Sequence, residues 1–392
     1  MTTTTTTTGP RVVDLALGDP GHPAPAAVRV ALRRAAERTS FGYAPASGFG
    51  ALRESLAEKL TRSNRIAARP GEVVVTTGAS QGIYATLAAL CAPGDRVLVP
   101  APGYPAYRAA CRTLGLVVVD YPVGRGQDAA PDWARLEALA GDARVLLWNY
   151  PSNPTGTIAD PAWYPRLYAL LDAHPGLTAV SDEVYEELCF DAPHVSPAAA
   201  AGPVADRIVS VFSFSKAYAM TGMRVGYLHA RAELAARISR AHWGVGMSTP
   251  AVSQLCALAV LHGAGDYPEE HRGVLRAGRD LLAGALSAAG LSVELPSAGC
   301  FLWLDVAGSG LDGLSWTRAA SEHCRVLVAP GRDFGPDCGD RVRISFAAPT
   351  VQLTAAAERF SRWAAAGWPG EGRPGPGAAP SPAPSAAVAV QP

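Results

Sequence analysis

Lysine is nearly absent from this chain, which has two lysines among 392 residues and otherwise carries its positive charge on arginine. The formal net charge is zero, so no excess of positive charge favours nucleic acid or an acidic membrane surface as a partner. No stretch approaches 18 uninterrupted apolar residues, and the first residues contain no apolar segment like that of a signal peptide. These absences indicate a cytoplasmic protein without membrane or nucleic-acid partners.

Three kinds of motif are also missing. The seven cysteines are scattered without a C-x-x-C pair, which argues against a disulfide framework and, with the dispersed histidines, against a metal site. No G-x-x-x-x-G-K-[ST] segment occurs, and no G-x-G-x-x-G segment lies between a predicted strand and a helix. The two commonest nucleotide-phosphate motifs are therefore excluded.

Short β-branched runs alternate with helical patterns along the middle of the chain. The candidate strands are residues 72–77, 96–101, 116–123, 144–150, 177–182, 207–213 and 223–229. Continuous apolar runs of this kind are typical of strands buried on both faces, and the alternation predicts βαβ units with a mostly parallel sheet. A long helical pattern from about Tyr267 to Ala289 then leads into "LSVELPSAGCFLWLDV", which predicts a second, smaller α+β domain.

Polar residues follow several of these strands, where ligands bind in parallel α/β sheets. "GASQG" follows residues 72–77 and opens a helix, so the backbone N–H groups of Ala79 and Ser80 can bind an anion. Tyr104 follows the second strand and Asn153 the fourth. Asp182 ends a buried strand; an acid there is either paired or a helix N-cap, and Tyr185 comes three residues later.

Lys216 lies in "SFSKAYAMTGMRVGY", after the strand 207–213 and beside Ser213 and Ser215, with Arg224 eight residues on. A lysine amine can form a Schiff base, whereas an arginine side chain stays charged and is a poor nucleophile. The alternative is a chance surface lysine. The other lysine, Lys59, lies in "ALRESLAEKL", which has the pattern of an ordinary amphipathic helix. A lysine, an acid, an aromatic ring, an amide and an anion site are the groups that pyridoxal phosphate (PLP) requires.

Eight collinear motifs carry a family resemblance: "LALGDPGHPAP", "YAPASGFGALRESLAEKL", "TTGASQG", "PAPGYPAY", "NYPSNPTG", "SDEVYEEL", "SFSKAYAMTGMRVGY" and "RVRISFA". Over about residues 11–366 the chain resembles the fold-type I PLP-dependent enzymes of the aspartate aminotransferase family (class I and II). The resemblance implies an α/β fold, with a large domain holding a mostly parallel seven-stranded sheet between helices and a smaller α+β domain. The implied segments are a disordered start (1–10), part of the small domain (11–42), the large domain (43–266), the rest of the small domain (267–366) and a disordered tail (367–392).

The resemblance also implies a role for each residue that matches a motif. Lys216 holds PLP and moves the proton, Asp182 keeps the pyridine nitrogen protonated, and Tyr185 and Asn153 bind the phenolic oxygen. Tyr104 stacks on the ring. The phosphate is held by Ala79, Ser80, Ser213, Ser215, Arg224 and, from the neighbouring subunit of a homodimer, Tyr43.

Arg343 in "RVRISFA" matches the residue that binds the substrate α-carboxylate, and Gly18 matches a glycine near it. The pattern alone also allows Arg343 to be a surface arginine on an edge strand. Some bacterial relatives have a lysine where this chain has Ser80, so the resemblance gives no support for aspartate or glutamate as the preferred substrate.

The resulting prediction is a PLP-dependent aminotransferase that moves an amino group between an L-amino acid and a 2-oxo acid by a ping-pong mechanism through pyridoxamine phosphate. The alternatives are another PLP reaction on an amino acid (β-lyase, decarboxylase or oxidase) and a PLP-binding regulator. The regulator would need an N-terminal DNA-binding module, for which the first 17 residues are too short.

Overall fold

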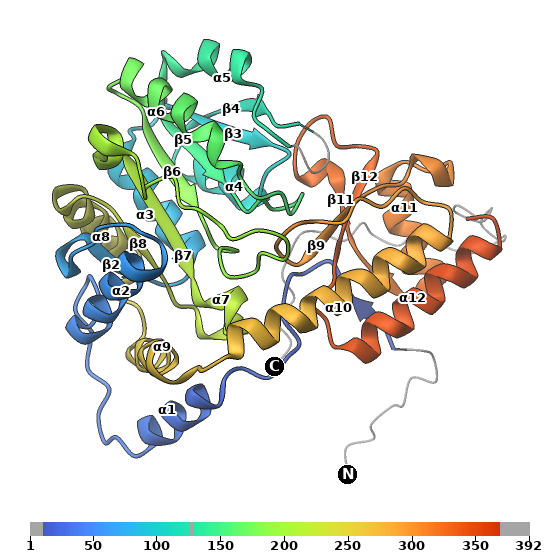
Figure 1. Cartoon of the computed structure of the whole chain (residues 1–392), viewed down its shortest axis with the longest axis horizontal. Coiled ribbons are helices and arrows are strands. Elements are labelled where there is room, and N and C mark those ends of the chain that lie inside the picture. Colours follow the sequence, from blue (N-terminus) through green and yellow to red (C-terminus); the bar gives the residue numbers. More distant parts are fainter. Residues whose placement is uncertain (1–10, 125–128, 369–392) are drawn as a thin grey trace.

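The computed structural model describes residues 11–124 and 129–368. The predicted disordered start and almost all of the predicted tail lie outside these residues. Within them, two units share the chain, one built on a seven-stranded sheet and one on a three-stranded sheet (Figure 1). No helix in the described part of the chain is both long and apolar enough to cross a membrane.

The large sheet contains all seven predicted strands, in the order β2-β8-β7-β6-β5-β3-β4. Its strands are β2 (Val73–Thr76), β3 (Arg96–Ala101), β4 (Val117–Pro122), β5 (Ala143–Asn149), β6 (Thr178–Asp182), β7 (Ile208–Ser213) and β8 (Gly226–His229). Only β8 is antiparallel to its neighbours, β2 and β7. The predicted fold class, an α/β protein with a mostly parallel sheet, is confirmed.

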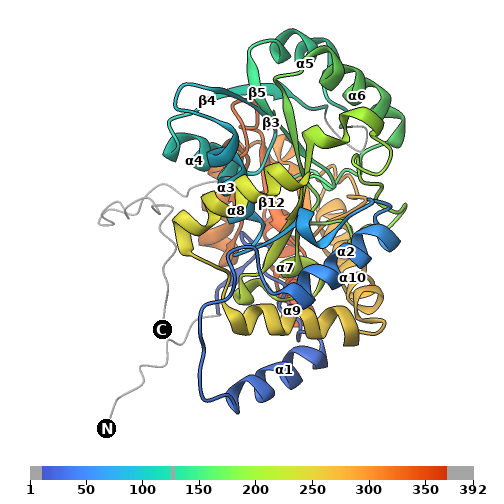
Figure 2. The ribbon, with the colours of Figure 1, turned by 90° about the vertical axis from the view of Figure 1, so that its left-hand side faces the viewer.

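Helices cover both faces of this sheet, as Figures 1 and 2 show. One face packs against α3 (Ala79–Leu90), α4 (Pro105–Thr113) and α8 (Ala232–Gly246). The other packs against two groups of helices: α5 (Trp133–Ala140) with α6 (Tyr164–Ala173), and α2 (Gly50–Ser63) with α9 (Ala251–Gly263). The sheet is therefore buried on both faces, which explains its uninterrupted apolar strands.

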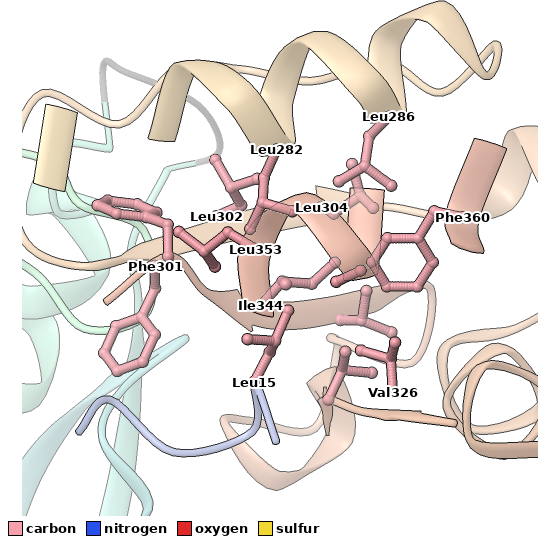
Figure 3. Close-up of a cluster of buried hydrophobic side chains, with 14 of the residues drawn as sticks. Leu15, Leu282, Leu286, Phe301, Leu302, Leu304, Val326, Ile344, Leu353 and Phe360 are labelled. Carbon is pink, nitrogen blue, oxygen red and sulfur yellow. The ribbon is translucent and has the colours of Figure 1, made fainter. Parts of the chain in front are cut away.

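The second unit is an antiparallel sheet in the order β11-β12-β9, covered by helices. Its strands are β9 (Phe301–Asp305), β11 (Ala329–Pro330) and β12 (Arg341–Ser345), and its helices are α10 (Tyr267–Ala288), α11 (Gly313–Ala319) and α12 (Thr350–Ala365). Figure 3 shows leucines of α10 meeting Leu302, Leu304 and Phe360 in its core. Leu15 reaches the same core from the start of the chain, where β1 (Val13–Asp14) pairs with β10 (Val326–Leu327).

The segment predicted as the N-terminal part of the small domain, 11–42, divides between the two units. Strand β1 joins the C-terminal unit, whereas α1 (Ala26–Ala36) lies beside α9 in both views of the ribbon (Figures 1 and 2). Val28 and Ala31 of α1 share an apolar cluster with Leu56 and Val260 of the large unit. The apolar face of α1 thus packs on the large unit, while the domain boundaries themselves stay predictions.

Candidate active site

The predicted site residues follow strands that end at one edge of the large sheet. Strands β3, β5, β6 and β7 are mutually parallel, and β2 runs the same way because it pairs through the antiparallel β8. The residues that follow or end these strands are Gly78, Tyr104, Asn153, Asp182 and Lys216. Topology therefore gathers them, although they are far apart in sequence.

A short helix carries the predicted nucleophile. Helix α7 (Phe214–Ala217) follows β7 without a gap, and Ser213 begins it by accepting a hydrogen bond from the N–H of Ser215 at 3.1 Å. Serine is a preferred N-cap, so the sequence S-F-S-K fixes the turn that brings Lys216 to the strand end.

The Lys216 side chain extends toward the start of the chain, where Nζ donates a hydrogen bond to the carbonyl oxygen of Gly18. Burial is the main cause that lowers the pKa of Lys216; Cys300 and Asp19 oppose this shift, and the charges of Arg343 and Arg224 add to it. A Cβ at Gly18 would lie 2.3 Å from Phe301, so only glycine fits beside the amine. A lowered pKa favours the neutral amine, which is the form that attacks a carbonyl.

Asp182 is a buried carboxylate, 5% exposed, at the end of β6. Its Oδ2 accepts a hydrogen bond from the Tyr107 hydroxyl at 2.5 Å, and its Oδ1 accepts one from the N–H of Val184 at 3.3 Å. Burial raises the pKa of Asp182 to about 6, although both hydrogen bonds oppose that rise. A buried acid with these neutral partners is suited to receive a cation.

Arg343 is 7% exposed and lies on the central strand of its sheet, so the surface-arginine alternative is wrong. Its Nη1 donates to Asn153 Oδ1 at 2.9 Å, and its Nη2 donates to the carbonyl oxygen of Ala16 at 2.7 Å. The guanidinium lies 3.8 Å from the ring centroid of Phe301 and 4.7 Å from that of Phe334. Two aromatic rings and two hydrogen bonds hold it in place without a carboxylate partner among these contacts.

Gly78 and Arg224 meet at the turn between β2 and α3. Gly78 has φ +79°, and a Cβ there would lie 2.6 Å from Arg224 Nη2. Arg224 itself has φ +49° and donates from Nη1 to the carbonyl oxygen of Thr221 at 2.9 Å. Ala79 and Ser80 begin the first turn of α3, and the first N–H groups of a helix have no acceptor within the helix. A helix N-terminus next to an arginine is an anion site.

The three predicted tyrosines have different surroundings. Tyr185 is buried, its ring 6.3 Å from that of Phe301, and burial raises its pKa well above the usual range. Tyr104 is partly buried and meets Tyr107 edge to face at 5.4 Å. Tyr43 is 84% exposed, so the fold does not bury it among the other predicted residues.

Sequence reasoning missed two residues that organise this site. Tyr107, which binds Asp182, follows Tyr104 by three residues in "PGYPAY", and that helical spacing was a signal. Asn149 ends β5, donates to the carbonyl oxygen of Asp182 at 3.2 Å and accepts from the N–H of Asn153 at 2.9 Å. His242, in "AHWGVGMSTP", is a buried packing residue that accepts from the N–H of Thr77 at 3.3 Å and so supports the turn before α3.

The side chains present fit PLP. Within residues 11–124 and 129–368 no cation pairs with the buried Asp182, and a protonated pyridine nitrogen would supply one; Lys216 offers an amine of lowered pKa for the aldehyde. The N-terminus of α3 offers backbone N–H donors to a phosphate. The Arg224 guanidinium lies next to Gly78, the residue before α3, and can donate to the same phosphate.

Comparison with known proteins gives one family. Residues 10–360 match the family described as Aminotransferase class I and II. The chain is 33% identical to the aspartate/prephenate aminotransferase of Thermus thermophilus, covering 90% of this chain and 91% of that protein. It is also 33% identical to the valine–pyruvate aminotransferase of Mycobacterium tuberculosis, over 90% and 91% of the two chains. A solved structure of the Thermus thermophilus aspartate aminotransferase with maleate superposes with a TM-score of 0.84, at 32% identity over 90% of this chain and 91% of that one.

Proposed function

Because this chain belongs to the aminotransferase class I and II family and is a PLP-dependent aminotransferase, we propose that its active site is the cluster around Lys216 and Asp182. Bound PLP supplies an aldehyde that captures an amino group and a ring that accepts electrons. The observation that carries the proposal is the buried acid Asp182, whose neutral partners leave it open to a ring cation.

The residues of the cluster divide the work by position. Asp182 would hold the proton on the ring nitrogen; Tyr107 orients its carboxylate, and Asn149 holds its backbone carbonyl. Lys216 provides the amine and afterwards carries the proton at the reacting carbon, for which its lowered pKa is suited. Tyr185 and Asn153 donate to the phenolic oxygen, and Tyr104 covers one face of the ring.

Phosphate and substrate are bound at opposite ends of the cluster. The groups that hold the phosphate are the N–H groups of Ala79 and Ser80, the hydroxyls of Ser213 and Ser215, and the guanidinium of Arg224. Arg343, held by Asn153 and two aromatic rings, binds the α-carboxylate beside Gly18. Every α-amino acid has that carboxylate, so Arg343 orients the substrate without selecting its side chain.

A homodimer with shared sites is the second part of the proposal. Large apolar side chains are exposed on two segments, residues 41–43 and 243–247, with Tyr43 84% and Trp243 54% exposed. The second segment lies beside the start of α3, because His242 accepts a hydrogen bond from the N–H of Thr77 and a Cβ at Gly246 would lie 3.4 Å from the side chain of Gln81. Large apolar side chains exposed in this way favour a subunit contact, in which Tyr43 reaches the phosphate of the neighbouring site.

We also propose that the protein is cytoplasmic, a placement favoured by cysteines kept as buried thiols, such as Cys111, Cys256 and Cys300. Fractionation of the source cells with an antibody against the chain tests this placement.

The activity is tested by absorbance of the PLP-loaded protein mixed with single L-amino acids, without a 2-oxo acid. We expect the visible PLP band to give way to a near-ultraviolet band with one or a few donors, and to return on adding a 2-oxo acid. The Lys216→Arg variant should not make this conversion, since arginine cannot form the Schiff base. A wild-type band that persists while oxygen is consumed or a side-chain fragment is released would contradict amino transfer.

A further inference from the structure

Lys59, the second lysine of the chain, lies inside the protein. The sequence predicts an ordinary residue of an amphipathic helix, but Lys59 in α2 is only 8% exposed. Burying a lysine requires partners that replace its water. Of the two lysines in the chain, Lys59 is therefore buried in the large unit, and Lys216 lies at the candidate active site.

The partners of Lys59 form a closed cluster. Its Nζ makes an ion pair with Glu186, donates to Asn64 Oδ1 at 3.1 Å and lies 3.4 Å from Glu187 Oε1. Asn64 Nδ2 donates to the other oxygen of Glu186, so both oxygens of that carboxylate are held. Burial alone would lower the pKa of Lys59, but Glu186, Tyr227 and Glu187 raise it well above the usual range. The compact ammonium with three donors suits this cluster better than a planar guanidinium.

The cluster adjoins Tyr185, the residue that would donate to the phenolic oxygen of bound PLP. Glu186 follows Tyr185 in a turn closed by hydrogen bonds from the N–H of Glu186 to the carbonyl oxygen of Glu183 at 3.0 Å, and from the N–H of Leu188 to that of Tyr185 at 2.9 Å. Tyr185 packs on the C-terminal unit through Phe301, while Glu186 points to α2. Two consecutive side chains of one turn therefore have different partners: Tyr185 packs against Phe301, and Glu186 pairs with Lys59.

Lys59 also contacts the segment that carries the nucleophile. Its Nζ lies 5.5 Å from the ring centroid of Phe212, the residue before Ser213 on β7. Phe212 in turn stacks on Tyr227 at 5.0 Å. The same ammonium group thus touches the back of the Tyr185 turn and the back of the strand that leads to Lys216.

We propose that Lys59 is a positioning residue of the active site, which fixes Tyr185 through Glu186 and supports the Lys216 segment through Phe212. The proposal rests on the proposed function, because it assigns Tyr185 to the phenolic oxygen of PLP. A buried carboxylate held at both oxygens cannot rotate without losing its partners, so the turn next to it keeps one geometry.

The test compares wild type, Lys59→Met and the double variant Lys59→Met/Glu186→Leu. Lys59→Met leaves a buried carboxylate without its cation and can lose stability for that reason alone. The double variant replaces the ion pair by apolar side chains, a change that buried pairs often tolerate without loss of stability. Four quantities are measured: the thermal midpoint of the protein without PLP, the pKa of the visible chromophore of the PLP-loaded protein, and kcat and KM for the best donor.

We expect the double variant to keep the thermal midpoint of wild type yet to raise the chromophore pKa, because a misplaced Tyr185 donates less well to the negatively charged oxygen. Its kcat should fall on the order of tenfold or more with KM nearly unchanged, as expected when reacting groups are misplaced. A double variant with wild-type stability, chromophore pKa and kcat would overturn the proposal and leave the cluster a structural one.

Arg166→Met is the matched control. Arg166 also pairs with a glutamate, Glu137 at 2.9 Å, and lies 5.0 Å from the ring centroid of Trp133, but on the surface of the large unit. Its loss should leave the chromophore pKa unchanged. A wild-type protein that forms no visible band with added PLP would overturn the proposed function and this inference together, whereas a normal wild-type band with unshifted variants overturns the inference alone.

Discussion

At the scale of single residues, Asp182 shows how the site sets function against stability. Its folded-state pKa of about 6 lies above the usual 3.8, so the fold favours the protonated carboxyl. The stabilising contribution of that proton is present in full below pH 3.8 and is lost as the pH rises through 6. At neutral pH the buried Asp182 carboxylate is therefore charged in the protein without PLP, and this charge lowers the free energy of unfolding. A protonated ring nitrogen beside it would offset that loss.

We accordingly expect Asp182→Asn to stabilise the protein without PLP. The amide is uncharged and its oxygen can still accept from Tyr107. From the pKa difference, the gain in unfolding free energy is about 3 kcal/mol at pH 8 and about half of that at pH 5. Urea unfolding at the two pH values measures it, and an equal gain at both would contradict titration of Asp182 as the cause. The variant should lose amino transfer despite its stability.

At the scale of elements, the glycine in "TTGASQG" predicts the turn from β2 to α3. Gly78 has φ +79° and approaches Arg224, so an added methyl group meets the tip of a flexible side chain rather than the backbone. In Gly78→Ala the guanidinium must move away from the helix N-terminus. The change thereby disturbs the anion site in addition to straining the turn.

We expect Gly78→Ala to raise the dissociation constant of PLP at least about tenfold, as loss of one charge-assisted hydrogen bond would. Gly94→Ala is the control, since Gly94 has φ +94° with no atom within 4 Å of an added Cβ. Both variants carry the backbone strain, on the order of 1–3 kcal/mol. A PLP titration that weakens equally in both would show that strain alone, and not Arg224, determines binding.

The elements themselves could be predicted because each rests on local sequence. All seven strands of the large sheet and the long helix α10 follow from β-branched runs and helical periodicity. The placement of Lys216, Asp182 and Asn153 could also be predicted, since each is a polar residue at or after the end of an apolar strand; their roles stay predictions. The turn at Gly78 follows from its glycine.

At the scale of the whole molecule, prediction fails where a contact joins distant parts of the chain. Lys59 and Glu186 are 127 residues apart, and no local pattern distinguishes the buried Lys59 from an exposed helix lysine. The same holds for the hydrogen bond between Arg343 and Asn153, which are 190 residues apart. It also holds for α1, which packs on α9 of the large unit although the preceding strand β1 belongs to the C-terminal unit. Periodicity identifies an apolar face but not the element that covers it.

The subunit arrangement is likewise a property of the whole molecule, and a mixing experiment tests it. If Tyr43 acts across a dimer, a Lys216→Ala subunit and a Tyr43→Ala subunit together form one complete site, with Lys216 from one subunit and Tyr43 from the other. Random pairing makes about half of the dimers mixed, each with one complete site of two, so activity should recover to about a quarter of wild type. Each variant alone should stay well below that value. If Tyr43 served its own subunit, no complete site would form, and mixing would give only the average of the two variants.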